Sequence, residues 1–300
     1  MQNEFHKAVL LKESVDGLKI KKDGIYVDAT FGGGGHSKEI LKRLAEGQVF
    51  AFEQDEDAWR NKINDGRFIL IKQNFRNIKK ALKEVEVEKA DGLLADLGVS
   101  SHQFDTSERG FSTRFDAVLD MRMSREMDVT AAEILNEYER EDLKKVFKEY
   151  GELENAGAIA KVITVKREKK KIQQVSELRE MLKSFVKHGK ENQFFAKVFQ
   201  ALRIEVNDEL NALKDLLMQC SDIIKKEGRL VVISYHSLED RLVKNFIRSG
   251  KFEGEAEKDF YGNRITPFKQ LNKKIIQPTE KEIKSNPRAR SAKLRIAEKL

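Results

Sequence analysis

The chain has 300 residues, a formal net charge of +7 and 40% hydrophobic residues, a composition that excludes a disordered chain and allows one large domain or two. No apolar run approaches the roughly 18 residues of a membrane helix, and the N-terminal residues lack a secretory signal pattern. The single cysteine, Cys220, excludes an internal disulfide and is typical of a reducing compartment, so we expect a cytoplasmic protein. The five histidines form no metal-ligand motif, and we expect no metal site.

The first predicted strand, residues 24–28, ends in Asp28 and leads to four consecutive glycines, residues 32–35. Apolar residues at helical spacing predict a helix over residues 38–44. Strand, glycine loop and helix are typical of the entry to an open α/β nucleotide-binding sheet. Glycine lets a ligand approach the backbone closely, and a helix N-terminus offers free N–H groups to an anion.

The spacing of the glycines and a second acid indicate which ligand the loop binds. A dinucleotide fingerprint needs a third glycine where this chain has Ser37 or Lys38, which weakens the case for NAD. A second predicted strand, residues 48–53, ends in Glu53, and an acid in that place suits a ribose diol. Together these features favour S-adenosylmethionine. The alternative is a glycine loop that only makes a tight turn.

More strands and helices alternate along the next part of the chain. Two more strands are predicted over residues 67–72 and 91–98, and the latter contains Asp96. This alternation predicts a parallel, doubly wound sheet whose ligands lie at the carboxyl ends of the strands. Phe75, just past the third strand, suits either the face of an adenine or the core. Helices are predicted over residues 55–62 and 79–85.

The alternation stops after the fourth strand. Residues 99–105 are expected to form a polar loop, and Thr130 begins a capping box. Helical spacing recurs over residues 139–150, 154–165 and 175–186. We therefore predict a first part of the sheet domain over residues 1–104, an inserted helical domain over 105–195 and a second part of the sheet domain over 196–300.

The second part of the sheet domain begins with a long helix over residues 199–217, with a break near Asn207. A fifth strand follows over residues 228–234, then a turn at Tyr235 and His236. A capping-box pattern beginning at Ser237 predicts the next helix. Residues 251–277 are irregular in pattern, and residues 290–297 alternate like a final strand.

Basic residues are concentrated near the C-terminal end. Residues 264–300 contain eleven Lys and Arg against three Asp and Glu, which accounts for the whole positive excess. Such a segment favours a polyanion such as nucleic acid. The run at residues 166–171 fits a solvated surface equally well.

Three acids, Asp28, Glu53 and Asp96, end successive strands and should converge on one crevice. In a methyl transfer to an exocyclic base amine, Asp96 could accept a hydrogen bond from the amine, or it could only bind the cofactor. His236 suits contact with a phosphate or base, or simple packing before a helix. His36 is expected to order the glycine loop or contact the cofactor.

Eight stretches, spread in order over essentially the whole chain, carry a family resemblance. They are residues 6–11, 28–37, 96–103, 108–112, 119–123, 199–210, 233–241 and 286–291. On these motifs the chain resembles the bacterial N4-cytidine methyltransferases of small-subunit ribosomal RNA (the RsmH family, formerly MraW).

The resemblance implies an α/β fold, a class I (Rossmann-like) S-adenosylmethionine-dependent methyltransferase sheet with an inserted, mostly helical substrate-recognition domain. It implies N4-methylation of a cytidine in the decoding region of 16S ribosomal RNA, with the small ribosomal subunit as partner. An exposed helical insert would also allow a homodimer. The family's cofactor residues correspond to Gly34, Gly35, His36, Glu53, Phe75, Asp96 and Gln103.

The chain departs from the family pattern at several places. Glu53 stands where an aspartate is usual, Ala117-Val118 replaces a common Gly-Pro, and Lys197-Val198 replaces a common Arg-Thr. The D-P-P-Y tetrad of many amino-methyltransferases is absent after Asp96, which leaves the group that accepts from the amine open. Rival functions are the same chemistry on DNA, a non-enzymatic assembly factor that binds ribosomal RNA, and, more distantly, a nicotinamide oxidoreductase.

Overall fold

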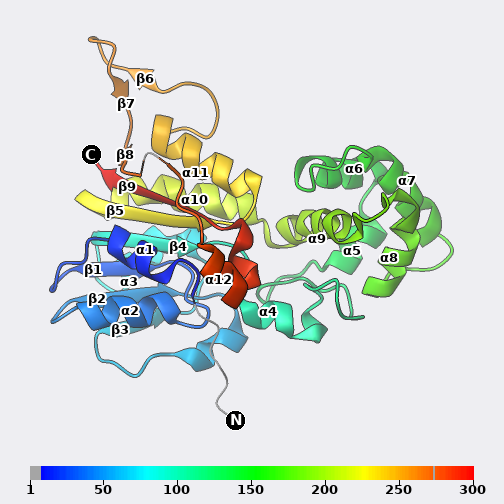
Figure 1. Ribbon diagram of the computed structural model, residues 1–300, viewed down its shortest axis with the longest axis horizontal. Coiled ribbons are helices and arrows are strands. Elements are labelled where there is room, and N and C mark those ends of the chain that lie inside the picture. The colour runs from blue at the N-terminus through cyan, green and yellow to red at the C-terminus, as the bar shows by residue number, and fades with distance from the viewer. Residues whose placement is uncertain (1–7, 273) are drawn as a thin grey trace. The chain divides into compact units, whose positions relative to one another are not determined.

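The computed structural model describes residues 8–272 and 274–300, and the chain divides into two compact units. The first unit comprises Met1–Gly98 and Leu210–Leu300, and the second comprises Val99–Glu209 (Figure 1). The motif at residues 6–11 begins with His6 and Lys7, which lie outside the described residues. No helix in the described part of the chain is long and apolar enough to cross a membrane.

A seven-stranded sheet forms the centre of the first unit, in the order β3-β2-β1-β4-β5-β9-β8. Its first five strands are parallel, which confirms the predicted sheet, and β9 runs antiparallel to both of its neighbours. The strands are β1 Ile25–Asp28, β2 Gln48–Phe52, β3 Phe68–Ile71, β4 Ala90–Asp96, β5 Ile224–Ser234, β8 Phe268–Gln270 and β9 Lys293–Lys299.

Helices cover both faces of this sheet (Figure 1). Successive side chains of a strand point to opposite faces, so Leu93 of β4 joins one apolar cluster and Leu94 joins the other. One cluster includes side chains of α3, α10 and α11, and the other includes side chains of α1 and α2. The helices are α1 Leu11–Gly17, α2 Gly35–Arg43, α3 Ile78–Glu84, α10 Glu209–Ile223, α11 Ser237–Ser249 and α12 Glu280–Ser285.

The second unit is mostly helical and has an apolar core of its own, centred on Leu143, Phe147, Ile159 and Leu202. The predicted insert, residues 105–195, lies within it. The unit extends further because the helix expected to begin at residue 199 begins at Glu191 and ends at Asn207. Asp208 follows in a left-handed conformation, with φ 49°, which makes the break predicted there. The helices are α4 Ser101–Asp105, α5 Ala131–Glu137, α6 Arg140–Glu149, α7 Ala156–Arg167, α8 Val175–Leu182 and α9 Glu191–Asn207.

Three local predictions were wrong. Residues 101–105 form the short helix α4 rather than a loop, because the Ser100 hydroxyl accepts from the Gln103 N–H and the Gln103 side chain accepts from the Ser100 N–H. The cap of α11 is His236, one residue before the expected Ser237. The segment expected to be irregular, residues 251–277, contains β8 and a separate hairpin of β6 Glu257–Lys258 and β7 Arg264–Ile265.

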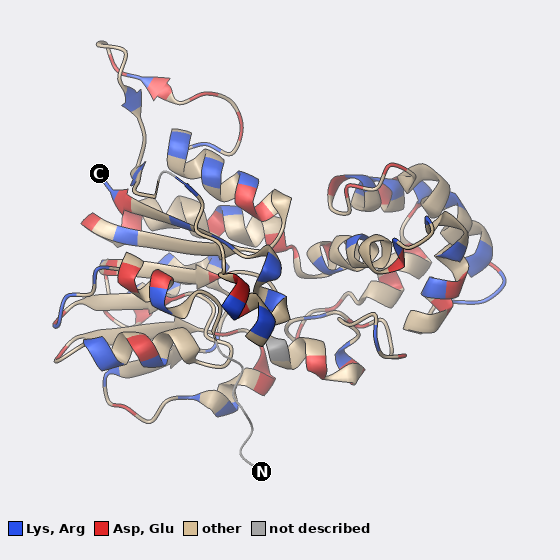
Figure 2. Cartoon of the chain, viewed as in Figure 1, with Lys and Arg blue, Asp and Glu red and all other residues tan. Residues whose placement is uncertain are grey.

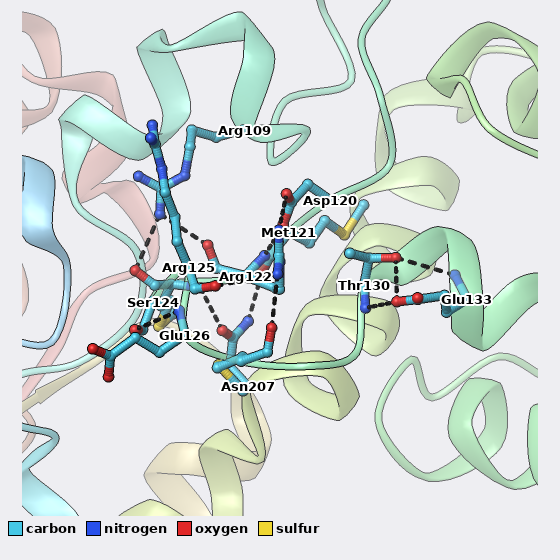
Figure 3. A network of polar contacts seen from close by, with 12 residues as sticks. Arg109, Asp120, Met121, Arg122, Ser124, Arg125, Glu126, Thr130, Glu133 and Asn207 are labelled. Atoms are coloured by element: carbon cyan, nitrogen blue, oxygen red, sulfur yellow. Dashed lines mark hydrogen bonds and ion pairs between the residues drawn. The ribbon is translucent and has the colours of Figure 1, made fainter.

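An irregular segment of the second unit is held by polar contacts to its backbone (Figure 3). The Asn207 amide accepts from the N–H of Met123 at 2.7 Å and donates to the carbonyl of Met121 at 2.8 Å. The Arg109 guanidinium donates to the carbonyls of Arg122 and Met123. Met121 has a positive φ of 61°, a strained conformation for a side chain of its size, so these contacts fix an unfavourable turn.

Candidate functional site

Three acids lie at the carboxyl ends of adjacent parallel strands in the first unit. Asp28 ends β1, Asp96 ends β4, and Glu53 directly follows β2. Asp28 is fully buried, and burial raises the pKa of its carboxyl group. Burial is the main cause that raises the pKa of Glu53 and of Asp96, and the charge of Asp28 adds a smaller effect in the same direction.

Hydrogen bonds to Asp28 hold the glycine loop in place, and part of the loop's backbone remains accessible to a ligand. Asp28 accepts hydrogen bonds from the N–H of Thr30 at 3.1 Å and from the hydroxyl of Ser37 at 2.6 Å. Gly34 has φ +74°, the left-handed region that favours glycine, and α2 begins directly after it. A Cβ atom at Gly33 would meet no atom within 4 Å, so a ligand can approach the backbone there.

Glu53 joins the second strand to the glycine loop. One carboxylate oxygen accepts from the N–H of Gly32 at 2.8 Å, and the other accepts from the N–H of Asp55 at 2.8 Å. Burial outweighs these bonds and raises the pKa of Glu53 to about 7. Because each carboxylate oxygen has about two lone-pair sites, both can still accept a bond from a ligand hydroxyl.

His36 is buried at the start of α2, between two parts of the site. Its Nε2 lies 3.1 Å from the carbonyl oxygen of Val9, and since a carbonyl can only accept, Nε2 carries the proton. Its Nδ1 faces the carboxylate of Asp96 at 3.9 Å, beyond a direct hydrogen bond. The contact with Val9 orders the chain before α1 against the glycine loop.

Asp96 is held by residues from two other elements. Its N–H donates to the Thr30 hydroxyl at 2.7 Å, and its Oδ1 accepts from the Tyr235 hydroxyl at 2.7 Å. Desolvation is the largest effect on Asp96 and raises its pKa to about 6, while nearby His36 and Tyr235 lower it. The side chain keeps 21% of its surface exposed, so the carboxylate remains accessible.

His236 caps α11. Its Nδ1 accepts from the N–H of Glu239 at 3.4 Å, and its Nε2 lies 3.1 Å from the Glu239 carboxylate in a geometry that makes no hydrogen bond. The same carboxylate accepts from the N–H of Tyr235 at 2.8 Å. The two side chains thus shape the turn that carries Tyr235 to Asp96.

The other two cofactor residues expected from the resemblance are Phe75 and Gln103. Phe75 begins a 3-10 turn, Phe75–Asn77, and its half-buried ring packs against the core while keeping part of its surface open. Gln103 belongs to the second unit, where its side chain is buried and takes part in the α4 cap.

Sequence reasoning did not assign roles to Thr30, Ser37 or Tyr235. The signal for Tyr235 lies in the sheet register, since Asp96 of β4 pairs with Ile233 of β5 and Tyr235 stands two residues further on. Ser37 stands two residues after the last glycine of the loop, and its bond to a buried acid depends on the path of that loop.

A model of the MraW methylase family matches residues 3–300 of the chain. The chain belongs to this family. Its most similar relatives include proteins named "Ribosomal RNA small subunit methyltransferase H". That of Christiangramia forsetii is 58% identical, over 99% of this chain and 98% of the relative. That of Flavobacterium psychrophilum is 59% identical, over 97% and 100%. That of Bacteroides thetaiotaomicron is 54% identical, over 98% and 97%.

Membership of this methylase family identifies the chain as an S-adenosylmethionine-dependent methyltransferase with a class I, Rossmann-like sheet. When bound, this cofactor supplies a methyl group on a positively charged sulfur. The residues present fit it: Glu53 retains acceptor sites for a ribose diol, and Gly33 offers open backbone. The exposed part of the Asp96 carboxylate offers an acceptor beside them.

Proposed function

We propose that the chain methylates N4 of a cytidine in the decoding region of 16S ribosomal RNA, on the assembled small subunit in the cytoplasm. The observation that carries this proposal is the similarity to relatives named ribosomal RNA small subunit methyltransferase H, which are 53–59% identical over nearly their whole length. The chemistry of the site residues supports the proposal.

Asp96 is the proposed acceptor for the reacting amine. The N4 lone pair of cytosine is delocalised into the ring, so the amine needs a partner that draws on its N–H as the new N–C bond forms. A carboxyl group can accept a bond from the amine N–H in this way only when it is ionised. With a pKa of about 6, Asp96 is mostly ionised at neutral pH. The Tyr235 hydroxyl fixes one of its oxygens, leaving the other to face the substrate.

In this reaction the amine nitrogen would take the methyl group that the cofactor supplies, and the proton that the nitrogen loses would pass to the Asp96 carboxylate. A role for Asp96 in cofactor binding alone is the competing assignment. A substitution of Asp96 distinguishes the two roles. If Asp96 only binds the cofactor, the substitution changes the cofactor Kd, and if Asp96 accepts from the amine, it changes kcat.

The proposed cofactor contacts are Gly34, Gly35 and His36 of the glycine loop, together with Glu53, Phe75, Asp96 and Gln103. The second unit is the proposed substrate-recognition domain. We assign the ribose diol to Glu53, because an acid after the second strand serves that purpose in related sheets. His236 is assigned to the turn before α11 rather than to proton transfer, because both of its ring nitrogens face Glu239.

A basic surface close to the site supports an RNA substrate. On α12, Lys281 and Lys284 balance Glu280 and Glu282, and the net positive charge comes from Arg288 and Arg290 on the following 3-10 turn, Pro287–Ser291 (Figure 2). The Glu282 carboxylate of α12 accepts from the N–H of Leu10 at 2.7 Å, next to the residue whose carbonyl contacts His36. This basic surface is therefore tied to the glycine loop, where it can attract the phosphates of a substrate.

The test is methyl transfer from labelled S-adenosylmethionine to small subunits that lack the modification, followed by nucleoside analysis. We expect label in N4-methylcytidine, and loss of that label for Asp96→Asn with an unchanged unfolding midpoint. Label in another nucleoside would contradict the proposed atom. RNA binding without transfer would favour an assembly factor, and label in duplex DNA offered in parallel would favour the DNA enzyme.

A further inference from the structure

The hairpin of β6 and β7 carries the most exposed large apolar side chains in the described part of the chain. Phe260 is 97% exposed and Tyr261 is 86% exposed, both in the turn between the two strands. The hairpin forms a two-stranded sheet of its own and projects beyond α11 and β8 (Figure 1). A group of exposed aromatic side chains is typical of an interaction site, because exposing apolar surface to water costs free energy that binding a partner recovers.

The turn is built so that both rings stay in solvent. The Asp259 carboxylate accepts from the N–H of Tyr261 at 2.9 Å, and from the N–H and the side chain of Asn263 at 2.8 and 3.0 Å. These bonds lower the pKa of Asp259, so it stays ionised and keeps the turn closed. The rings themselves stand at 87° to each other, with centroids 5.6 Å apart, which leaves flat surface of each ring free.

Two cations lie on the two strands that the turn connects. Lys258 and Arg264 are opposite each other in the antiparallel register, and among the described residues neither has an ion-pair partner. Like charges in such a pair repel each other, and an anion between them removes that cost. Both acids next to Lys258 in sequence have other partners: the Asp259 carboxylate accepts bonds within the turn, and Glu257 is paired with Lys251 at 2.9 Å.

Flat aromatic faces next to unpaired cations are the two elements that bind single-stranded nucleic acid: bases stack on the rings and phosphates contact the cations. We propose that Phe260 and Tyr261 stack on unpaired bases of the substrate RNA, with Lys258 and Arg264 against its phosphates. This inference rests on the proposed function, since the RNA is the substrate of that function. It adds a docking element outside the methyl-transfer site.

The test compares the affinity of full-length variants for protein-free small-subunit RNA and for a fully paired RNA duplex. Phe260→Ala/Tyr261→Ala removes the rings, and Phe260→Leu/Tyr261→Leu keeps apolar bulk without a flat aromatic face. Val85→Ala/Met218→Ala is the matched control, because both residues are exposed apolar side chains of the same unit. Cofactor affinity, measured by calorimetry, checks the fold of every variant.

We expect the Ala pair and the Leu pair to weaken binding of small-subunit RNA by about tenfold or more, and to leave duplex binding and cofactor affinity unchanged. The control should bind as the unaltered chain does. Lys258→Ala/Arg264→Ala should reduce the slope of log K against log salt by about 1.4, the value for two phosphate contacts on a single strand.

Several results would overturn the inference. One is an unchanged affinity of the Ala pair for small-subunit RNA, and another is an affinity of the Leu pair equal to that of the unaltered chain. A third is a loss of affinity seen only with whole subunits, which would indicate a ribosomal protein as partner. Loss of binding to phosphatidylserine vesicles with RNA binding intact would indicate a membrane surface. Methyl transfer by the unaltered chain is scored separately: transfer without a hairpin effect removes only the hairpin, and a hairpin effect without transfer removes only the proposed function.

Discussion

The hydroxyl of Tyr235 donates a 2.7 Å hydrogen bond to Oδ1 of Asp96, joining the residue that follows β5 to the last residue of β4. The bond stabilises the ionised form of Asp96, whereas burial favours the neutral form and raises the pKa to about 6. Tyr235 is therefore a positioning residue that also sets the pH at which Asp96 becomes an acceptor.

Tyr235→Phe should raise the pKa of Asp96 further, because the bond that favours the carboxylate is lost. Since activity requires the ionised form, the acid limb of the kcat profile between pH 5 and 8 should move to higher pH, by about one unit. Tyr138→Phe is the control, because it removes a similar 2.9 Å bond to Glu205 in the second unit. A profile that keeps its midpoint would show that the Tyr235 hydroxyl does not act on Asp96.

Cofactor affinity should depend on the ionisation of Glu53, whose pKa is raised to about 7 in the free protein, chiefly by burial. Only the carboxylate form accepts two ribose hydroxyls while keeping its bonds to the N–H groups of Gly32 and Asp55. Affinity should therefore rise from pH 6 to pH 8, and binding near pH 6.5 should release protons. Calorimetry in buffers of different ionisation enthalpy measures this release.

The variant Glu53→Gln shows how much of the proton release on cofactor binding comes from Glu53 and how much comes from Asp96. This variant should bind the cofactor more weakly at pH 8 and release fewer protons at pH 6.5. Equal proton release by the two proteins would assign the effect to Asp96 or another group.

The same raised pKa predicts how the stability of the cofactor-free protein changes with pH. The folded state holds a proton on Glu53 at pH values where the unfolded chain, with an ordinary pKa near 4.5, has lost it. The contribution of Glu53 is fully present below pH 4.5 and is lost as the pH rises through 7. Urea unfolding of the cofactor-free protein at pH 5 and pH 8 should show this loss, and a larger contribution from Glu53 at pH 8 would contradict it.

Ser37→Ala should destabilise the first unit, because it leaves an oxygen of the fully buried Asp28 carboxylate without its 2.6 Å donor. The expected loss is about 1–3 kcal/mol of unfolding free energy. Ser14→Ala is a matched control, since Ser14 is as deeply buried but its hydroxyl has no hydrogen-bond partner. That substitution should cost less than about 0.5 kcal/mol or stabilise the protein, because it removes an unsatisfied polar group. Equal losses from the two would show that the bond to Asp28 contributes nothing.

Asn207→Ala should release the irregular segment of the second unit, since the Asn207 amide bonds to the backbone of both Met121 and Met123 (Figure 3). We expect a loss of about 2–3 kcal/mol, because buried backbone groups lose their partners. Hydrogen exchange over residues 119–127 should be faster. Asn192→Ala, at an exposed position of the same helix, is the control. Unchanged exchange in the Asn207 variant would mean that the contacts of Arg109 hold the turn alone.

The parallel sheet could be predicted because its strands are short apolar runs that alternate with helical patterns. The helix α4 was missed because five residues are too few to show a 3.6-residue period, although Ser100 and Gln103 carried a capping-box signal. The cap of α11 was misplaced by one residue because histidine is not a usual N-cap, and its role depends on the Glu239 side chain that meets it.

The acids of the site were visible because each ends a strand, whereas their hydrogen-bond donors were not. Tyr235 and Thr30 reach Asp96 across neighbouring strands, so their roles follow from register, which sequence pattern alone does not specify. The hairpin was missed because two-residue strands show no alternation, and the exposure of Phe260 depends on a turn made by Asp259.

The position of β9 sets an order of events during synthesis. β5 lies between β4 and β9 in the sheet, although residues 99–209 separate it from β4 in sequence and β9 ends at Lys299. The second unit is continuous in sequence, so it can fold as soon as it leaves the ribosomal exit tunnel. On the β9 side, the edge of β5 stays unpaired until β9 emerges. Each nascent chain therefore exposes the open edge of β5 for as long as β9 has not been made.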